Sequence, residues 1–357
     1  MGRSERLVGR AQARDVLDGA LHEVRSGAGQ LVLISGEPGI GKSALLSWLI
    51  ERATPSYRVL RGFCWEGSGV PPYWPWTQVL RATGLTTATL GEAGWLLGAG
   101  EPAEPGDALA AADAQFRLFD AVARSLAGLA DTPARPVVVV VIDDLHWADE
   151  PSLMLLSFVH RAVATNPVLI VGAYRDDEAP PRLQQLAAGA HHVPLPGLSS
   201  PEVEEMVEAI CGEPPSPSLV AGIRQRSGGN PLFVGELTRL LQAQGTDRPP
   251  SHLPAGVVET VRRRLARLPT ACVQLLDWAA VAGRDIDIGL LVRSGAADDE
   301  TAALDTLNPA RQVGVVTATD TLHFTHDLYR EAILEGLPAT RNAAINLAIG
   351  RTLQRRA

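Results

Sequence analysis

Residues 31–46 read LVLISGEPGIGKSALL, and this stretch decides the fold. Its apolar start, Leu31–Ile34, is typical of a buried strand, and its end, Ala44–Leu46, is typical of a helix. Gly36–Ser43 lies between them and fits the pattern G-x4-G-K-S completely. Glycines in such a loop let successive backbone N–H groups point at phosphates, and the N-terminus of the next helix adds positive potential. The stretch therefore predicts a phosphate-binding loop between a strand and a helix.

The side chains of this loop predict a nucleotide bound with Mg²⁺. Lys42 is expected to reach the β- and γ-phosphates, and the Ser43 hydroxyl is expected to ligate the metal. A chance Gly-rich turn is the alternative, but it does not account for the strand before the loop and the helix after it. The predicted ATP- or ADP-binding residues of the loop are Gly36, Glu37, Pro38, Gly39, Ile40, Gly41, Lys42, Ser43 and Ala44.

A pair of acidic residues follows the longest aliphatic run of the chain. Val137–Ile142 is entirely aliphatic, which predicts a central strand buried on both faces. Asp143 and Asp144 come directly after it, at the carboxyl edge of the sheet where such folds bind ligands. Asp143 suits Mg²⁺ binding, and Asp144 suits polarisation of an attacking water. Their alternative use as helix caps is weaker, because Asp149 stands directly before Glu150-Pro151 and is better placed as a cap.

Arg175 follows another predicted strand, Val168–Ala173. A guanidinium at that edge can contact a γ-phosphate and report its presence, so Arg175 is a candidate catalytic sensor. The alternative is a salt bridge to one of the three acidic residues at positions 176–178. His146 and Trp147, beside the acidic pair, are expected to pack under the sheet edge rather than to act in catalysis.

The two halves of the chain have different patterns. Residues 1–197 alternate short apolar runs with helical stretches, which predicts an α/β fold of the P-loop NTPase type, a parallel sheet with helices on both faces. From residue 198 onward helices dominate, and a short hairpin around Asp320 precedes a helix at His326–Leu334. We therefore expect a P-loop ATPase domain at 1–197, a helical lid domain at 198–267 and a winged-helix-like domain at 268–357. The predicted strands of the sheet are Leu31–Ser35, Val59–Phe63, Val137–Ile142, Val168–Ala173 and His192–Leu195.

The composition limits the cellular environments and the binding partners that we expect for this protein. The 357 residues carry a net charge of −8, and an acidic chain binds the DNA backbone poorly without clustered Lys and Arg. The aliphatic runs are too short to span a membrane, and the first residues lack the apolar core of a signal peptide. The three cysteines are widely separated, which argues against a disulfide framework or a zinc site. We therefore expect a cytoplasmic protein without membrane contact.

Seven stretches resemble, in this order, the nucleotide-binding module of the STAND ATPases (signal-transduction ATPases with numerous domains). The nearest resemblance is to the large ATP-binding LuxR-type transcriptional regulators, and it covers nearly the whole chain. The pair DDLHWAD and GGNPLF is more selective than the generic phosphate loop. The stretches are LVGRAQARDVLDGAL, GEPGIGKSALL, PYWPWTQVLR, VIDDLHWADEPSLMLLSFV, VGAYRDDE, SGGNPLFVGEL and FTHDLYREAIL.

The resemblance implies two further contacts with the nucleotide base. Val8, Gly9 and Arg10 match the segment that lies against the adenine and ribose in such modules. Pro231 matches the proline of the helical lid that packs on the adenine. Without the resemblance, Pro231 would be an ordinary proline near a helix start after a Gly-rich turn.

The resemblance also implies a contact with the phosphates. Thr325-His326-Asp327 resembles the Met-His-Asp motif of related switches, in which the histidine contacts the β-phosphate of ADP and holds the module closed. Thr325 replaces the methionine here. By its position alone, His326 would more often be a helix N-terminal residue paired with Asp327.

These features predict a regulatory switch that hydrolyses ATP slowly, with likeness to AAA+ proteins in its core. Its ATP or ADP state would control conformation and self-association, and an unidentified inducer would act on it. DNA would be bound only through a C-terminal helix-turn-helix, which this chain does not contain. The alternatives are a mechanical, ring-forming AAA+ ATPase, with Arg161 as a candidate trans arginine finger, and a small-molecule kinase. The kinase leaves the long helical half unexplained.

Overall fold

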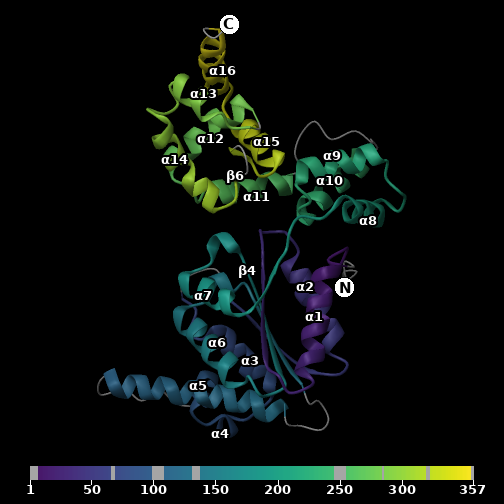
Figure 1. Ribbon diagram of the computed structural model, residues 1–357, viewed down its shortest axis with the longest axis vertical. Coiled ribbons are helices and arrows are strands. Elements are labelled where there is room, and N and C mark those ends of the chain that lie inside the picture. Colours follow the sequence, from purple (N-terminus) through teal and green to yellow (C-terminus); the bar gives the residue numbers. More distant parts are fainter. Residues whose placement is uncertain are drawn as a thin grey trace. The chain divides into compact units, whose positions relative to one another are not determined.

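The computed structural model describes residues 7–65, 69–98, 108–130, 137–244, 255–283, 285–318 and 322–354. The chain divides into two compact units, Met1–Leu195 and Pro196–Ala357. The first contains a five-stranded sheet with helices, and the second contains helices and a two-stranded sheet (Figure 1). The predicted boundary at 267 between lid and winged-helix-like domains stays a prediction, since one hydrophobic cluster of the second unit includes Val261 and Leu268 together.

The sheet of the first unit is entirely parallel and has the strand order β2-β3-β4-β1-β5. Its carboxyl edge therefore brings together the chain segments that follow each strand, and β4 lies between β1 and β3. The predicted P-loop NTPase sheet is confirmed, with each predicted strand shifted by one residue at most at either end. The strands are β1 (Gln30–Ser35), β2 (Arg58–Phe63), β3 (Val138–Asp143), β4 (Val168–Tyr174) and β5 (His191–Pro194).

Helices cover both faces of this sheet, as predicted (Figure 1). Side chains alternate between faces along each strand, so Leu31 and Leu33 enter one hydrophobic cluster while Val32 and Ile34 enter the other. Continuous aliphatic strands are needed because both faces are buried. The cluster of Val32 includes α1 (Ala11–Val24) and α2 (Lys42–Ala53); that of Leu31 includes α3 (Trp74–Thr83), α5 (Ala108–Ala130), α6 (Glu150–Ala162) and α7 (Pro181–Gly189).

The stretch between Thr86 and Asp107 differs from the exposed excursion that its Gly- and Ala-rich composition predicts. Residues 87–97 form α4 (Thr87–Leu90) and the 3₁₀ helix η1 (Gly91–Leu97). Leu90 and Ala93 are buried in the same cluster as Leu31, and the partly buried Trp95 and Leu97 pack against that cluster. Residues 99–107 lie outside the described residues.

The second unit is helical, with one large hydrophobic cluster and a small one formed by Leu290, Ile345 and Ile349. Ser199 caps the first helix of this unit, and the Ser199 N–H donates to Glu202 Oε2 at 2.8 Å in a capping box. The predicted hairpin is present as β6 (Val316–Ala318) paired antiparallel with β7 (Leu322–Phe324), although Asp320 itself lies outside the described residues.

The helices of the second unit are α8 (Ser200–Cys211), α9 (Pro217–Ser227), α10 (Pro231–Gln244), α11 (Ala255–Leu265), α12 (Thr270–Ala282), α13 (Ile288–Arg293), α14 (Glu300–Gln312), α15 (Asp327–Gly336) and α16 (Ala339–Gln354). Among all helices in the described part of the chain, none combines the length and the apolar composition needed to cross a membrane.

Candidate functional site

The phosphate-binding loop connects the end of β1 to the start of α2. Three of its residues have positive φ angles: Gly36 at 146°, Gly39 at 76° and Gly41 at 103°. Only glycine adopts such angles readily, and a Cβ on Gly36 would also lie 3.0 Å from the backbone oxygen of Leu195. The glycines of the motif are therefore required by the backbone path that curls the loop in front of the N-terminus of α2.

Lys42 lies at the first position of α2 and is folded onto its own loop. Its ammonium Nζ donates to the backbone oxygens of Gly36 at 2.7 Å and of Glu37 at 2.9 Å. Burial lowers the pKa of Lys42 from 10.5 to about 8, with the positive charge of Arg175 as the next contribution. Lys42 is also the only lysine in the sequence. A phosphate arriving at the loop would supply the negative charge that stabilises this ammonium.

Arg10 attaches the predicted adenine-binding segment to the loop. Gly9 and Arg10 are both left-handed, with φ angles of 64° and 61°, and α1 begins directly after them. The buried Arg10 guanidinium Nη2 donates to the backbone oxygen of Ile40 at 2.7 Å. Val8, Gly9 and Arg10 are thus held next to the phosphate-binding loop, while their contact with a base or ribose stays a prediction.

The acidic pair stands at the same sheet edge, at the end of β3. Asp143 is the last residue of the strand, and its Oδ1 accepts the backbone N–H of Asp144 at 2.9 Å. Burial, followed by the negative charge of Asp143, raises the pKa of Asp144, while Arg175 and Lys42 oppose the rise. Asp144 therefore shares one electrostatic environment with these two cations. A carboxylate with a raised pKa is better able to accept a proton from water.

Arg175 follows β4 directly and is already engaged in this structure. Its Nη1 lies 2.7 Å from Glu178 Oε1, and its guanidinium lies 4.9 Å from the centre of the Trp147 ring. The salt bridge that the sequence offered as an alternative is therefore present. The sensor role of Arg175 stays a prediction, and it would require the guanidinium to leave Glu178 or to contact phosphate beside it.

His146 and Trp147 form a short 3₁₀ helix, η2 (Leu145–Trp147), after the acidic pair. The His146 side chain is buried, and its Nε2 lies 3.8 Å from Asp144 Oδ1 and 3.8 Å from Glu178 Oε2. Packing of His146 under the sheet edge agrees with the prediction. The contact of Trp147 with the candidate sensor was missed, because nothing in the local sequence pairs an indole with an arginine on another strand.

Asp149 caps α6 as the sequence indicated. Its carboxylate accepts the backbone N–H of Ser152 at 3.3 Å. Its Oδ2 also accepts the backbone N–H of Tyr73 at 3.3 Å, which connects the acidic segment to the start of α3. The cap thus leaves Asp143 and Asp144 for the nucleotide site.

Pro231 and His326 belong to the second unit, where the structure shows their local surroundings. Pro231 is the first residue of α10. His326 immediately precedes α15, is buried, and lies 5.6 Å from the Tyr329 ring in a stacked arrangement and 5.8 Å from the Phe233 ring at its edge. A Cβ on Gly228 would lie 2.0 Å from His326 Nδ1.

The turn before Pro231 and the histidine motif therefore contact each other directly within this unit. We call the residues Gly228, Phe233, His326 and Tyr329 the histidine cluster. Sequence reasoning identified both motifs but missed their contact, because Gly228 and His326 are almost a hundred positions apart. The roles of Pro231 and His326 in nucleotide binding stay predictions.

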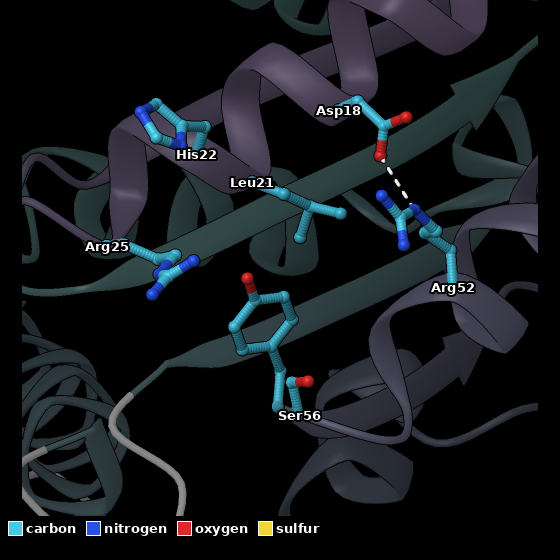
Figure 2. Close-up of a pocket in the computed structure, with 7 residues that line it drawn as sticks. Asp18, Leu21, His22, Arg25, Arg52 and Ser56 are labelled. Carbon is cyan, nitrogen blue, oxygen red and sulfur yellow. Dashed lines mark hydrogen bonds and ion pairs between the residues drawn. The ribbon is translucent and has the colours of Figure 1, made fainter.

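A pocket of about 350 Å³ lies at the opposite end of α2 from the phosphate-binding loop (Figure 2). Arg52 Nε lies 3.1 Å from Asp18 Oδ1 across its mouth, and Arg25 also points into it. Both arginines stand at helix C-termini, where cations ordinarily offset the partial negative charge of the backbone. Among the described residues that line it, none is a predicted site residue: they are Asp18, Leu21, His22, Arg25, Arg52, Ser56 and Tyr57.

Comparison with known proteins agrees with this site. Residues 6–171 match the model of a protein family described as the AAA ATPase domain. An uncharacterized protein of Rhizobium meliloti is 28% identical over 301 residues, which cover 75% of this chain and 29% of that protein. This chain thus spans less than a third of the curated relative it matches. Residues 6–171 thus resemble an AAA ATPase domain, and the loop and the parallel sheet fit a P-loop fold, which implies nucleotide binding, typically with Mg²⁺.

Three solved structures are similar over most of this chain. A RuvB variant of Thermotoga maritima has a TM-score of 0.42 at 17% identity, covering 93% of this chain and 96% of its own. Cdc6p of Pyrobaculum aerophilum has a TM-score of 0.45 at 14% identity, with coverages of 97% and 95%. The Drosophila ORC bound to DNA has a TM-score of 0.46 at 11% identity, with coverages of 98% and 88%.

Proposed function

We propose that this chain is the switch module of a LuxR-type transcriptional regulator of the STAND class, one that binds ATP and hydrolyses it slowly. Lys42 and the loop backbone would hold the phosphates, Ser43 and Asp143 would hold Mg²⁺, and Asp144 would polarise the attacking water. The ATP or ADP state would then control the conformation and the self-association of the module.

The proposal of slow hydrolysis is supported by the contacts that Arg175 already makes with neighbouring side chains. Fast phosphoryl transfer needs a cation that stabilises the charge of the transition state. Arg175 is the candidate for that cation within this chain, yet it is paired with Glu178 at 2.7 Å and stacked on Trp147. Because this ion pair must be disturbed before the guanidinium can serve the transition state, turnover by the isolated module should be slow.

His326 would distinguish the two nucleotides. We propose that its imidazole contacts the β-phosphate of ADP and that Pro231 packs on the adenine, as the resemblance implies. The histidine cluster supports this proposal because it holds the ring in one orientation through Gly228 and Tyr329. The same cluster joins α9, α10 and α15, so the proposed lid and winged-helix regions would move together between ATP and ADP states.

The proposal of a switch module also implies its partners. The relative from Rhizobium meliloti is more than three times as long as the region it shares with this chain, which supports a place for such a module within a larger protein. DNA would be bound through a helix-turn-helix outside residues 1–357, and the inducer would act through other parts of that protein or through this module.

A ring-forming AAA+ ATPase is the second candidate function. Arg161 favours it: this residue is exposed in the last turn of α6, where a guanidinium could reach a neighbouring copy. A trans arginine finger of this kind would accelerate hydrolysis when the ring assembles. The two functions therefore differ in how turnover depends on protein concentration.

Steady-state ATP hydrolysis, measured over a wide range of protein concentrations, tests the proposal. A switch module should show low turnover per molecule that does not change with concentration. Turnover per molecule that rises with concentration in the parent protein, and does not rise in Arg161→Ala, would establish the ring ATPase instead. The nucleotide released by denaturing the purified protein gives an independent check, because a switch at rest should retain ADP or ATP.

A further inference from the structure

A second pocket in the first unit lies behind the acidic segment that follows β3. Its volume is about 120 Å³. Three separate parts of the chain form its walls: the end of β2, the start of α3, and the turn between β3 and α6. The lining residues are Cys64, Trp65, Val70, Pro71, Trp74, Pro75, Trp147, Ala148 and Asp149.

Three indole rings dominate this pocket, which we call the tryptophan pocket. Trp65 is 60% exposed, an unusual fraction for so large an apolar side chain. A cavity of about 150 Å³ in a protein can hold benzene, so the tryptophan pocket suits a group of about that size and is too small for a larger ligand. Asp149 is the ionisable carboxylate in its wall.

Asp149 is the charged group in the described wall of the pocket. Its carboxylate accepts the backbone N–H groups of Ser152 and Tyr73, each at 3.3 Å, which holds it in place beside the indole rings. A carboxylate in the wall attracts a small cation and repels a small anion.

The rings of this pocket already accept cations. The Arg81 guanidinium lies 5.5 Å from the centre of the Trp74 ring, and the Arg175 guanidinium lies 4.9 Å from that of Trp147. Neither arginine is among the described residues that line the pocket. Three indoles, those of Trp65, Trp74 and Trp147, thus line the described wall of the pocket without an arginine beside them in that wall.

We infer that the tryptophan pocket binds an alkylated ammonium group, of the size of the trimethylammonium head of choline. Indole faces attract such cations through their quadrupole, and the methyl groups gain from contact with apolar walls. The Asp149 carboxylate supplies a full negative charge in the wall. A neutral apolar group would gain only the contact with the walls, and an inorganic cation would lose its hydration without carbon groups to pack.

A group bound in this pocket would contact residues that are themselves in contact with the nucleotide site. The Cys64 backbone N–H donates to the backbone oxygen of Asp143 at 3.1 Å. Trp147, in the opposite wall, holds Arg175 through its ring. We therefore infer that the bound ammonium group regulates the hydrolytic site through Asp143 and Arg175; this consequence rests on the proposed ATPase switch, whereas binding itself does not.

Binding can be tested with choline as the probe, followed by the relaxation of its methyl resonance in the presence of the protein. The neutral isostere of choline, in which carbon replaces the quaternary nitrogen, is the matched control ligand. We expect saturable binding of choline, about tenfold tighter than that of the isostere. Equal affinity for the two, or no saturable binding of choline in the millimolar range, would overturn the inference.

Two exposed aromatic residues provide matched variants. Trp65→Leu removes one ring of the pocket and should weaken choline binding about fivefold or more. Phe116→Leu, at a residue 58% exposed on α5 outside the pocket, should leave it unchanged. Both sites are solvent-exposed, so both variants should fold. Equal choline affinity in parent, Trp65→Leu and Phe116→Leu would show that choline binds elsewhere and would overturn the assignment of the pocket.

The regulatory consequence needs a separate readout, the rate at which a fluorescent ADP analogue is released. Saturating choline should change this rate about twofold or more in the parent and leave it unchanged in Trp65→Leu, because an interaction of about 0.5 kcal/mol suffices for that change. Choline that binds without any change in ADP release would overturn the link to the nucleotide site. Failure of the proposed switch would show itself differently, as turnover that rises with protein concentration in the absence of choline.

Discussion

The phosphate-binding loop and the histidine cluster are built in different ways. All residues of the loop lie within positions 36–44, and backbone geometry fixes their arrangement through three positive φ angles. The histidine cluster brings Gly228 and His326 together across almost a hundred positions, through contacts between elements that are far apart in the sequence. A site formed by one contiguous loop can be predicted in full from the sequence. For a site formed by residues far apart in the chain, the sequence indicates the separate motifs but not their contact.

The two sites should therefore respond differently to substitution. Lys42 contacts carbonyl oxygens of its own loop and lies where a phosphate would bind, so its loss should weaken ligand binding and leave folding intact. The ring of His326 packs between aromatic side chains and a glycine. Substitutions next to this ring should therefore lower the free energy of unfolding of the second unit.

Lys42→Ala should abolish measurable binding of Mg-ATP. Charged hydrogen bonds to two phosphates are together worth about 3 kcal/mol or more, which is a loss of at least about a hundredfold in affinity. Calorimetric titration of parent and variant measures the effect. Arg52→Ala is the control, because Arg52 is a cation near the other end of the same helix and pairs with Asp18. Unchanged affinity in Lys42→Ala would mean that the loop does not hold the nucleotide.

Asp143→Asn and Asp144→Asn should separate binding from hydrolysis. Asp143→Asn should weaken nucleotide binding only when Mg²⁺ is present, since the carboxylate acts through the metal. Asp144→Asn should leave affinity near that of the parent and slow hydrolysis by about a hundredfold, as expected for loss of a proton acceptor. Affinity with Mg²⁺, affinity with a chelator and turnover are measured for each. If both variants hydrolyse ATP at the parent rate, the acidic pair is not catalytic.

Most of the fold could be predicted from the sequence, because its two signals, the aliphatic runs and the loop glycines, each lie within one short stretch of the chain. The aliphatic run that became β3 predicts burial on both faces by its composition, and the loop glycines predict their own turn. Residues 87–97 were misread as exposed because their few apolar side chains carry no clear period. The contact between Trp147 and Arg175 escaped for another reason: two strands bring the residues together, and no spacing within either segment records it.

Gly228→Ala and Gly212→Ala form a matched pair that measures the tightness of the histidine cluster. Both glycines follow a helix with a left-handed φ, 59° for Gly228 and 82° for Gly212, so both variants share the same backbone strain. A Cβ at Gly212 meets nothing within 4 Å, whereas one at Gly228 lies 2.0 Å from His326 Nδ1. Gly228→Ala should therefore cost about 1–3 kcal/mol more in the free energy of unfolding.

Denaturant unfolding of the two glycine variants provides the comparison, provided that their m-values agree. Equal losses of stability would mean that His326 does not press on this turn. The histidine cluster would then be a loose contact, and its proposed role in orienting the imidazole would fail. A larger loss in Gly212→Ala would contradict the account in the same way.

The pKa of Lys42 offers the cleanest signal, because the chain contains a single lysine. Lysine labelled at its ε-carbon should give one side-chain resonance, which titrates with a midpoint at about 8 instead of 10.5 in nucleotide-free protein with a chelator present. ADP should move the midpoint upward, because the phosphates favour the charged ammonium. Affinity for ADP should accordingly fall as the pH rises above 8. A midpoint near 10.5 without nucleotide would show that Lys42 is not buried in this loop.

The dissociation constants of ADP and ATP, measured side by side for the parent and for His326→Ala, test the proposed switch most directly. Loss of a hydrogen bond to a charged β-phosphate oxygen should cost about 1.5–3 kcal/mol of ADP affinity and less of ATP affinity. Only such a difference lets a nucleotide shift a conformational equilibrium. His323→Ala, three residues earlier in β7, should change neither constant. Equal losses for ADP and ATP, or no loss for either, would contradict the switch as proposed and leave Arg175 as its sole candidate sensor.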